Sequence, residues 1–399
     1  MGAVEFNPFL PEFVADPYPF YARLRTEDPV HQSPMGLWVL TRYDDVARVL
    51  RDPRFGRKGF DELVNARFGT EPGQPGLATS MLFRDPPDHT RLRTLVSKAF
   101  TPRVIEGLRP HIQQIVDGLL DRVRDRRAMD LIADLAFPLP VIVISEMLGV
   151  PAADRDRFRQ WSLDVARSLD AIALPVGPEV IERGNAARRA LGDYFRGLIA
   201  ERRQRPQADL LTGLIAAEEQ GDTLSPPELI ATCVLLLVAG HETTVNLIGN
   251  GMLALLRHPA ELRRLGAEPA LLPSAVEELL RWDSPVQRTG RIAATDVELG
   301  GTLIPKGALV SAILGAANRD PAHFPEPDRL DLARPDNRHL AFGWGIHFCL
   351  GAPLARVEGQ IAIGALARRL PGLALATDRP EWRESSALRG LRALPVTFS

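Results

Sequence analysis

Cysteine is scarce in this sequence, whose 399 residues contain only Cys233 and Cys349. Two cysteines form one bridge at most, which excludes a fold held together by a disulfide framework. The start of the chain shows no basic and then apolar leader that ends in small residues. We therefore expect a protein of the reducing cytoplasm.

An excess of charge of one sign is also lacking, as are long hydrophobic runs. The 48 Lys and Arg residues nearly balance the 50 Asp and Glu residues, so a nucleic acid partner is not expected. The longest apolar run, about 231–239, is shorter than the ~20 residues that cross a bilayer. Pro138 and Pro140 interrupt the next apolar stretch, and proline also interrupts the first residues. We expect neither a membrane span nor an N-terminal anchor.

Helical periodicity is what the sequence has in abundance. Apolar residues recur at three- and four-residue steps from Ile105 to Val123, which predicts an amphipathic helix there. Ser225 and Glu228 have the spacing of a capping box, with prolines between them, and predict a helix that ends at Arg257. Similar signals predict further helices at 89–100, 186–203, 274–282 and 352–370.

Strand signals are fewer. They predict one hairpin that turns at Gly300-Gly301, and short strands at 38–41, 292–299, 302–304 and 308–314. Two stretches rich in turn-forming residues, 65–80 and 321–339, are predicted to be irregular. Neither a repeat nor a long linker divides the chain. We expect one catalytic domain over residues 1–399, mainly α with small β-sheets.

The segment from Phe342 to Gly351 concentrates chemistry around one cysteine. It places Cys349 among three glycines, directly before the helix predicted at 352. Glycine lets a backbone turn sharply and lie flat against a large planar ligand, and a helix N-terminus favours thiolate over thiol. An isolated cysteine is more often buried and inert, so the neighbouring residues decide the interpretation.

Phe342, Gly345, Cys349 and Gly351 have a spacing that resembles the haem-binding signature Phe-x-x-Gly-x-x-x-Cys-x-Gly of the cytochrome P-450 family. The resemblance implies haem b (iron protoporphyrin IX) as cofactor, with the Cys349 sulfur as iron ligand. It implies that His347 binds a haem propionate, the alternative being an unligated surface histidine. The implied fold is a triangular α-rich prism with the haem between an oxygen-activating helix and the helix after the cysteine.

Glu278 and Arg281 lie three apart on a predicted helix and can form an ion pair. Taken alone, such a pair is ordinary surface chemistry. Its place before the cysteine segment resembles the family's Glu-x-x-Arg helix, and Arg329 resembles the third member of the family's buried network. The implied role is structural, because the network would hold the segment that leads to Cys349.

Ala239, Gly240, Glu242 and Thr243 interrupt an apolar helix with a glycine, an acid and a hydroxyl, which costs stability. The motif resembles the family's oxygen-activating helix. By that resemblance Ala239 and Gly240 contact the haem, Thr243 holds a water and hydrogen-bonds dioxygen, and Glu242 helps to relay protons. The alternative is a kinked helix whose hydroxyls are satisfied by its own backbone.

His89 and Arg93 lie four apart on one predicted helical face, an arrangement suited to binding a carboxylate. The resemblance implies that both bind haem propionates. It implies the same for Arg291, which lies on a predicted strand after the Glu-x-x-Arg helix. The alternative for each is a solvated surface charge.

Together these matches imply a bacterial-type, soluble haem-thiolate monooxygenase that inserts one atom of dioxygen into a C–H bond of a lipophilic small molecule, such as a polyketide, terpenoid or fatty acid. A ferredoxin and an NAD(P)H-dependent ferredoxin reductase would supply electrons to a monomer. Alternatives are epoxidation, oxidative coupling or peroxygenase chemistry at the same haem, and a sensor or carrier without turnover. Candidates for a basic docking face are Arg91, Lys98, Arg103 and Arg356. The substrate pocket is expected from 65–85, 165–185, 235–239, 286–287 and 388–391.

Overall fold

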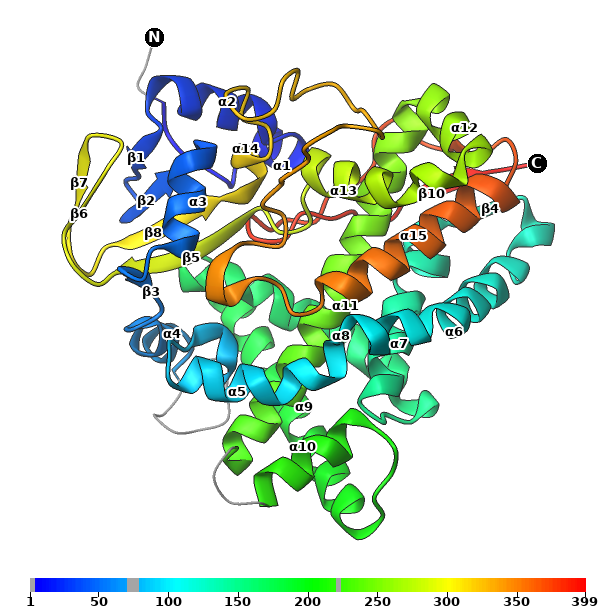
Figure 1. The fold of residues 1–399 in the computed structure, drawn as a ribbon, viewed down its shortest axis with the longest axis horizontal. Coiled ribbons are helices and arrows are strands. Elements are labelled where there is room, and N and C mark those ends of the chain that lie inside the picture. Colours follow the sequence, from blue (N-terminus) through cyan, green and yellow to red (C-terminus); the bar gives the residue numbers. More distant parts are fainter. Residues whose placement is uncertain (1–3, 70–78, 220–223) are drawn as a thin grey trace.

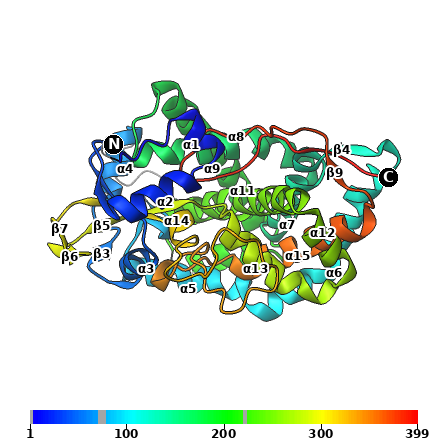
Figure 2. The same ribbon diagram turned by 90° about the horizontal axis from the view of Figure 1, so that it is seen from above.

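The computed structural model describes residues 4–69, 79–219 and 224–399, in an α-rich molecule that is broad in Figure 1 and shallower in Figure 2. Most helices gather around α11 (Pro226–Arg257), while the larger sheet lies on the other side beside the N-terminal helices (Figure 1). This confirms the prediction of a mainly α fold with small sheets. The other helices, in chain order, are α1 (Pro11–Ala15), α2 (Tyr18–Glu27), α3 (Tyr43–Arg51), α4 (Phe60–Phe68), α5 (Asp88–Ser97), α6 (Pro102–Asp121), α7 (Pro138–Met147), α8 (Arg155–Ser168), α9 (Pro178–Gln204), α10 (Leu210–Glu219), α12 (Pro259–Ala267), α13 (Leu272–Trp282), α14 (Leu314–Ala317) and α15 (Ala352–Arg369).

Helix α11 begins and ends where the sequence predicts. The Ser225 hydroxyl accepts a hydrogen bond from the Glu228 backbone N–H, and the Glu228 carboxylate accepts one from the Ser225 backbone N–H at 2.8 Å. By length and composition α11 could cross a membrane, contrary to the expectation from its longest apolar run, but 61% of its most apolar window is buried inside the protein. Such burial is typical of the core helix of a globular fold.

The larger sheet has five strands in the order β1-β2-β8-β5-β3, with β2 and β8 parallel and the other pairs antiparallel. A second sheet has the order β4-β10-β9, and β6 and β7 form the predicted hairpin. The strands are β1 (Val30–Gln32), β2 (Leu37–Leu40), β3 (Phe55–Gly56), β4 (Ala128–Asp130), β5 (Arg288–Ala293), β6 (Val297–Leu299), β7 (Thr302–Ile304), β8 (Leu309–Ile313), β9 (Ala374–Leu375) and β10 (Pro395–Thr397).

Three predicted boundaries differ from the structure. The predicted strand 292–299 is two strands, because the chain bends at 294–295 and the Ala293 carbonyl accepts the Gly307 N–H at 2.7 Å, which closes a loop that carries β6 and β7. The predicted loop 65–80 is wrong at its start, where residues up to Phe68 complete α4, and positions 70–78 lie outside the described residues. Helix α9 begins at Pro178, earlier than predicted, with proline in its first turn.

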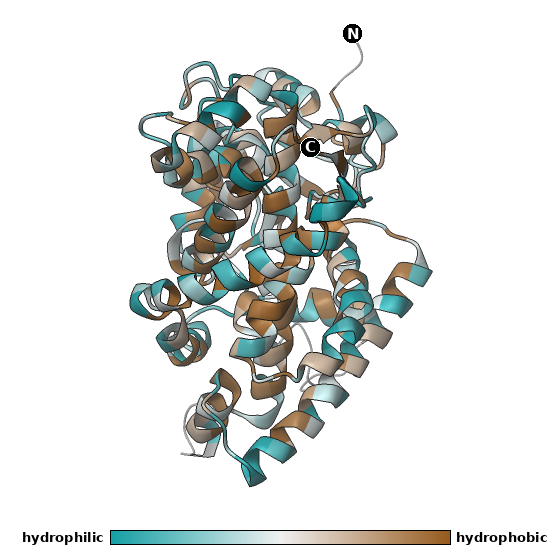
Figure 3. Cartoon of the chain, turned by 90° about the vertical axis from the view of Figure 1, so that its right-hand side faces the viewer, coloured by the Kyte–Doolittle hydropathy of each residue, from teal (hydrophilic) through white to brown (hydrophobic). Residues whose placement is uncertain are grey.

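The core that positions the site is formed by α11 together with α6, α7, α9, α13 and α15, whose apolar residues make one continuous buried cluster. Helices farther from α11 alternate hydrophilic and hydrophobic stretches along their length, as expected for helices with one buried face (Figure 3). The predicted irregular stretch 321–339 contains no helix or strand and leads along the surface to the cysteine segment. Its fixed course therefore depends on side-chain contacts rather than on a backbone ladder.

Candidate active site

A cavity of about 290 Å³ lies where α11, α5, β5 and the cysteine segment meet. Its walls are largely apolar and include Leu235, Leu236, Met81, Leu82 and Val286. The expected lining from 235–239 and 286 is confirmed. Among the described residues, 165–185, Gln287 and 388–391 do not line it, so that part of the prediction is wrong. Of these residues, Leu388 pairs with Val286 of the wall in an isolated antiparallel bridge.

The cysteine segment owes its shape to two glycines. Gly343 and Gly345 have φ values of +70° and +72°, which side-chain-bearing residues rarely adopt. A Cβ on Gly345 would also lie 2.5 Å from the carbonyl oxygen of Leu50. Gly351 differs, since its φ is −80° and no heavy atom lies within 4 Å of the place a Cβ would take. The first two glycines therefore form the turn, and Gly351 leaves open space at the edge of the cavity.

Cys349 lines this cavity directly before α15, and its backbone N–H donates to the Phe342 carbonyl at 2.9 Å. Removal from bulk water raises the pKa of the Cys349 thiol, although the backbone N–H groups of Gly351 and Ala352 and the guanidinium of Arg93 lower it. The helix N-terminus therefore acts as expected, since its N–H groups favour the thiolate, but burial outweighs them and the net pKa is raised. A cation on the sulfur, as in metal coordination, would favour the deprotonated form.

Four predicted side chains come together on the same cavity. His89 and Arg93 lie on α5, Arg291 lies on β5, and His347 precedes the cysteine. The rings of His89 and His347 are 4.4 Å apart, and Arg93 donates to the Phe348 carbonyl at 2.6 Å. Burial and the neighbouring guanidiniums lower the pKa of His347 to about 2, and burial lowers that of Arg291 to about 10. The cluster therefore forms a positive field that disfavours further protonation.

The sequence analysis missed one member of this cluster. Arg57, two residues beyond the start of β3, is buried and lines the cavity beside His347 and Arg291. No motif or helical spacing marks this position, and its place becomes visible only when β3 pairs with β5 in the sheet.

On α11, Thr243 lines the cavity and Glu242 does not. Ala239, Gly240 and Thr243 line the cavity, and the Thr243 hydroxyl donates to the Ala239 carbonyl at 3.1 Å. Glu242 does not line it. Its buried carboxylate forms an ion pair with Arg383 of the C-terminal segment, and its Oε2 has no hydrogen-bond partner among the described residues. The Glu242 carboxylate thus links α11 to Arg383, whose side chain is 21% exposed.

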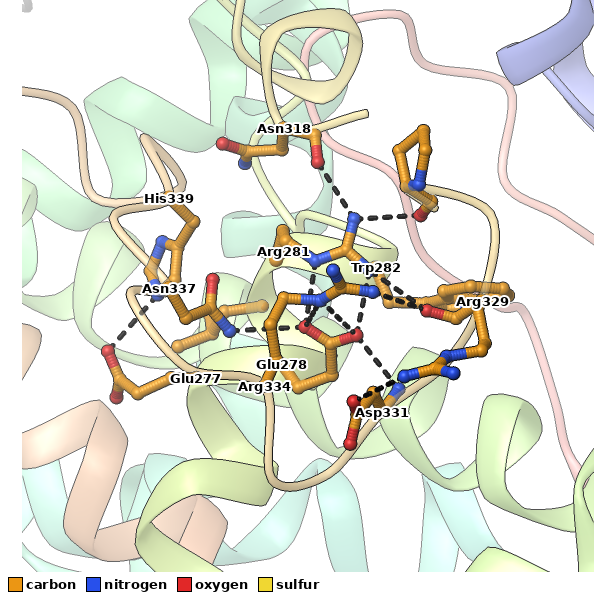
Figure 4. Close-up of polar contacts among 12 residues, drawn as sticks. Glu277, Glu278, Arg281, Trp282, Asn318, Arg329, Asp331, Arg334, Asn337 and His339 are labelled. Carbon is orange, nitrogen blue, oxygen red and sulfur yellow. Dashed lines mark hydrogen bonds and ion pairs between the residues drawn. The ribbon is translucent and has the colours of Figure 1, made fainter. Parts of the chain in front are cut away.

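Glu278 and Arg281 on α13 form a bidentate pair, with both N–O distances 2.7 Å and both side chains fully buried. Figure 4 shows the Arg281 guanidinium reaching the carbonyls of the irregular segment, with bonds of 3.0 Å to Asn318 and 2.9 Å to Pro327. Glu278 in turn accepts from the Asp331 backbone N–H at 3.0 Å. The pair therefore fixes the chain that leads to the cysteine segment.

The third cation of this network is Arg334, and the prediction of Arg329 is wrong. The Arg334 Nε is 3.1 Å from both carboxylate oxygens of Glu278, and its side chain is 7% exposed. Arg329 is 59% exposed and pairs with Asp331, pointing away from Glu278 (Figure 4). It contributes only its backbone carbonyl, which accepts from Arg334 at 2.8 Å. The chain turns between Arg329 and Arg334, so the Arg334 side chain points toward Glu278. No local sequence pattern predicts which of the two arginines is buried.

The family model of cytochrome P450 matches residues 29–371 of the chain. The chain belongs to the cytochrome P450 family. It is 48% identical to cytochrome P450 107B1 of Saccharopolyspora erythraea, covering 96% of this chain and 95% of that protein. It is 46% identical to the vitamin D(3) 25-hydroxylase of Pseudonocardia autotrophica, over 100% of this chain and 97% of that protein. The crystal structure of the myxobacterial cytochrome P450 CYP267B1 with myristic acid is similar at a TM-score of 0.91, with 49% identity over 98% of both chains.

Cytochromes P450 are monooxygenases that carry haem iron, and the cavity fits that group. Cys349 is the one cysteine that lines the cavity, and no group of three metal-ligating side chains exists among the described residues. Three buried nitrogens on the wall, His89 Nδ1, His347 Nε2 and Arg57 Nε, lack a hydrogen-bond partner within the described chain. Buried donors of this kind suit the two propionates of a haem.

A further buried acid of this P450, Glu358 on α15, was also missed by the sequence analysis. Burial raises its pKa to about 8, and the nearby Thr244 hydroxyl offsets part of that rise. Glu358 is fully buried, and its helix packs against α11. At neutral pH its carboxyl is therefore mainly protonated.

Glu358→Gln should change the pH dependence of stability. Because the pKa is raised by folding, the contribution of Glu358 is fully present below pH 4.5 and is lost as pH rises through 8. The wild type should lose about 1.4 kcal/mol per pH unit relative to the variant between these values. Thermal midpoints should thus be similar at pH 5, with the variant higher at pH 8. Parallel pH profiles of the two proteins would show that Glu358 is not buried in this protonation state.

Proposed function

We propose that this P450 uses haem b to hydroxylate a lipophilic natural product, such as a polyketide, terpenoid or fatty acid, as a single catalytic domain and a monomer in the cytoplasm. The observation that carries the proposal is the Cys349 sulfur facing the same apolar cavity as Thr243. An apolar wall binds an apolar substrate and excludes bulk water from it. The similarity to a vitamin D(3) hydroxylase and to a myristic acid complex supports a lipophilic substrate.

Haem, when bound, supplies the redox chemistry that activates dioxygen. Cys349, directly before α15, would hold it through sulfur, while His89, Arg93, Arg291 and His347 would bind its carboxylates. Thr243 presents a hydroxyl that can donate or accept a proton in the cavity. We assign to Glu242 the transfer of protons from the Arg383 side of α11 toward that hydroxyl. Phe342, Gly345 and Gly351 shape the segment around the sulfur, and Ala239 and Gly240 give the haem face of α11 its small side chains.

Electrons are proposed to come from a ferredoxin reduced by an NAD(P)H-dependent reductase. Of the candidates for the basic face, Arg91 pairs with Glu228 at 2.6 Å and Arg356 with Glu277 at 2.7 Å. Lys98 and Arg103 are exposed. These two residues therefore carry the positive charge best placed to attract an acidic partner.

Turnover with a surrogate ferredoxin and reductase tests the proposal. We expect NADPH consumption, stimulated by a lipophilic compound that also shifts the spin state, with one oxygen atom recovered in a hydroxylated product. Epoxidised or coupled products would assign the other reactions of the same haem. Turnover with peroxide alone would favour a peroxygenase, and haem binding without any NADPH consumption would favour a sensor or carrier.

Thr243→Ala should uncouple electron use from product. Loss of the hydroxyl removes the one proton-exchanging side chain that we place at the reacting oxygen, so product per NADPH should fall by up to about 10²-fold while NADPH is still consumed. Thr243→Ser keeps the hydroxyl and should retain most of the coupling. Product yield per NADPH equal to that of the wild type in Thr243→Ala would contradict the assignment.

A further inference from the structure

Arg57 holds a buried guanidinium that has no carboxylate oxygen within 4.0 Å among the described residues. It is 5% exposed, and its guanidinium carbon lies 5.0 Å from the ring of Phe60 and 5.8 Å from that of Phe83. Among the described residues its guanidinium makes one long side-chain hydrogen bond, 3.3 Å from Nη2 to the Thr289 hydroxyl, and its Nε makes none. Two aromatic faces thus fix a positive group at the wall of the cavity.

Most other buried arginines differ from Arg57 in having a carboxylate partner. In the described part of the chain, five buried arginines each have a carboxylate oxygen at 2.7–2.9 Å: Arg202, Arg281, Arg288, Arg319 and Arg389. The two buried arginines without a carboxylate within 4.0 Å are Arg57 and Arg291, and both line the cavity. Burying a charge without a partner is costly, so a partner is expected from outside the chain.

Asp85 is the nearest acid that acts on Arg57, but it is used elsewhere. Its Oδ2 accepts the backbone N–H groups of Arg57 and Lys58 at 2.8 and 2.9 Å. Gly56 makes room for it, because a Cβ there would lie 2.6 Å from the same oxygen. Asp85 therefore anchors the backbone of Arg57 and leaves the guanidinium free to bind an anion in the cavity.

We propose that Arg57 binds a carboxylate inside the cavity and that this carboxylate is a haem propionate, shared with Arg291. The proposal rests on the proposed haem site, since Arg57 stands beside His89 and His347 rather than near the apolar part of the cavity. Charge supports it as well. Three guanidiniums, those of Arg57, Arg93 and Arg291, line this one cavity, and such a concentration of positive charge attracts carboxylates.

The test compares Arg57→Leu and Arg57→Lys with the control Arg84→Leu, which removes a 33% exposed arginine 3.9 Å from Asp61. Haem transfer to apomyoglobin should be about tenfold faster or more for Arg57→Leu, because a buried carboxylate loses its charged donor. Arg57→Lys should restore part of the retention, and the control should match the wild type. The apoprotein of Arg57→Leu should unfold at the same temperature as the wild-type apoprotein or higher, because an unpaired charge beside Arg291 is gone.

A merely structural arginine would instead lower the unfolding temperatures of apoprotein and holoprotein alike, which would overturn the proposal. Wild-type haem retention in Arg57→Leu would overturn it too. The carboxylate could instead belong to the substrate. Spin-state titrations of Arg57→Leu with dodecanoic acid and with its methyl ester test this alternative. If the variant bound only the acid more weakly and retained haem like the wild type, Arg57 would be assigned to the substrate. If the wild-type protein lacked the thiolate-type ferrous carbonyl band, the proposed function itself would be refuted. That result differs from the outcomes above, which concern only the Arg57 variants.

Discussion

Cys349→Ala is expected to abolish thiolate ligation and monooxygenase turnover. Cys349 is the one cysteine on the cavity wall, where it can supply a thiolate, and the cationic and histidine side chains there are those that we assign to carboxylates. Losing only a partner of a metal ligand costs about 10–100-fold in affinity, so losing the ligand itself should lower haem affinity by about 100-fold or more. The measurements are haem titration of the apoprotein, the ferrous carbonyl spectrum and product formation.

Cys233→Ala is the matched control. Cys233 is fully buried on α11, and burial raises its pKa to about 12, so its thiol stays protonated. It does not line the cavity. The variant should therefore keep the spectrum and the turnover of the wild type. If Cys349→Ala retained the thiolate-type band, or if Cys233→Ala lost it, the assignment of the iron ligand would be wrong.

Arg281→Ala should largely prevent accumulation of folded, haem-containing protein. Removing one partner of a buried ion pair leaves the other charge without compensation, at a cost of about 3–5 kcal/mol. Natural proteins have only about 5–15 kcal/mol of net stability, so this loss is a large share of it. The same change removes the donors to Asn318 and Pro327 that hold the chain before the cysteine segment. Soluble yield, haem content and thermal unfolding measure the effect.

The neighbouring arginines provide graded controls. Arg334→Ala should be clearly destabilising, because it removes a 7% exposed cation from Glu278 and leaves Arg281 in place. Arg329→Ala should stay within about 0.5 kcal/mol of the wild type, since its side chain is exposed and its carbonyl is unchanged. A severe loss in Arg329→Ala with little effect in Arg334→Ala would mean that the sequence-based choice of third member was right after all.

Elements with local signals could be predicted closely. The capping box of Ser225 and Glu228 and the break before Pro259 set both ends of α11, because capping and proline act within a few residues. The hairpin at Gly300-Gly301 follows from glycines at φ +57° and +81°. Predictions failed where the signal was not local: residues 292–299 have continuous strand character, but the bond from the distant Gly307 N–H to the Ala293 carbonyl closes a separate loop, and β5 ends at Ala293.

At the site, too, the residues with local sequence signals could be predicted and the others could not. His89 and Arg93 share a helical face whatever the rest of the fold does, and the order of the cysteine motif needs no tertiary information. Arg57 could not be found in this way, because nothing in its neighbourhood distinguishes it from a surface arginine. Nor could Glu358, whose raised pKa comes from being enclosed between α15 and α11.

The sequence by itself determined both ends of α11, the proposal of Cys349 as haem ligand and the resemblance to the family, since these depend on residues that are close together in the chain. Only the tertiary structure decided which charges are buried and with whom: Arg334 rather than Arg329 at Glu278, Glu242 at Arg383, and Arg57 in the cavity. The physical reason is desolvation. The energy of a charge depends on the water it loses and the partner it gains, and both are set by segments that lie far apart in sequence.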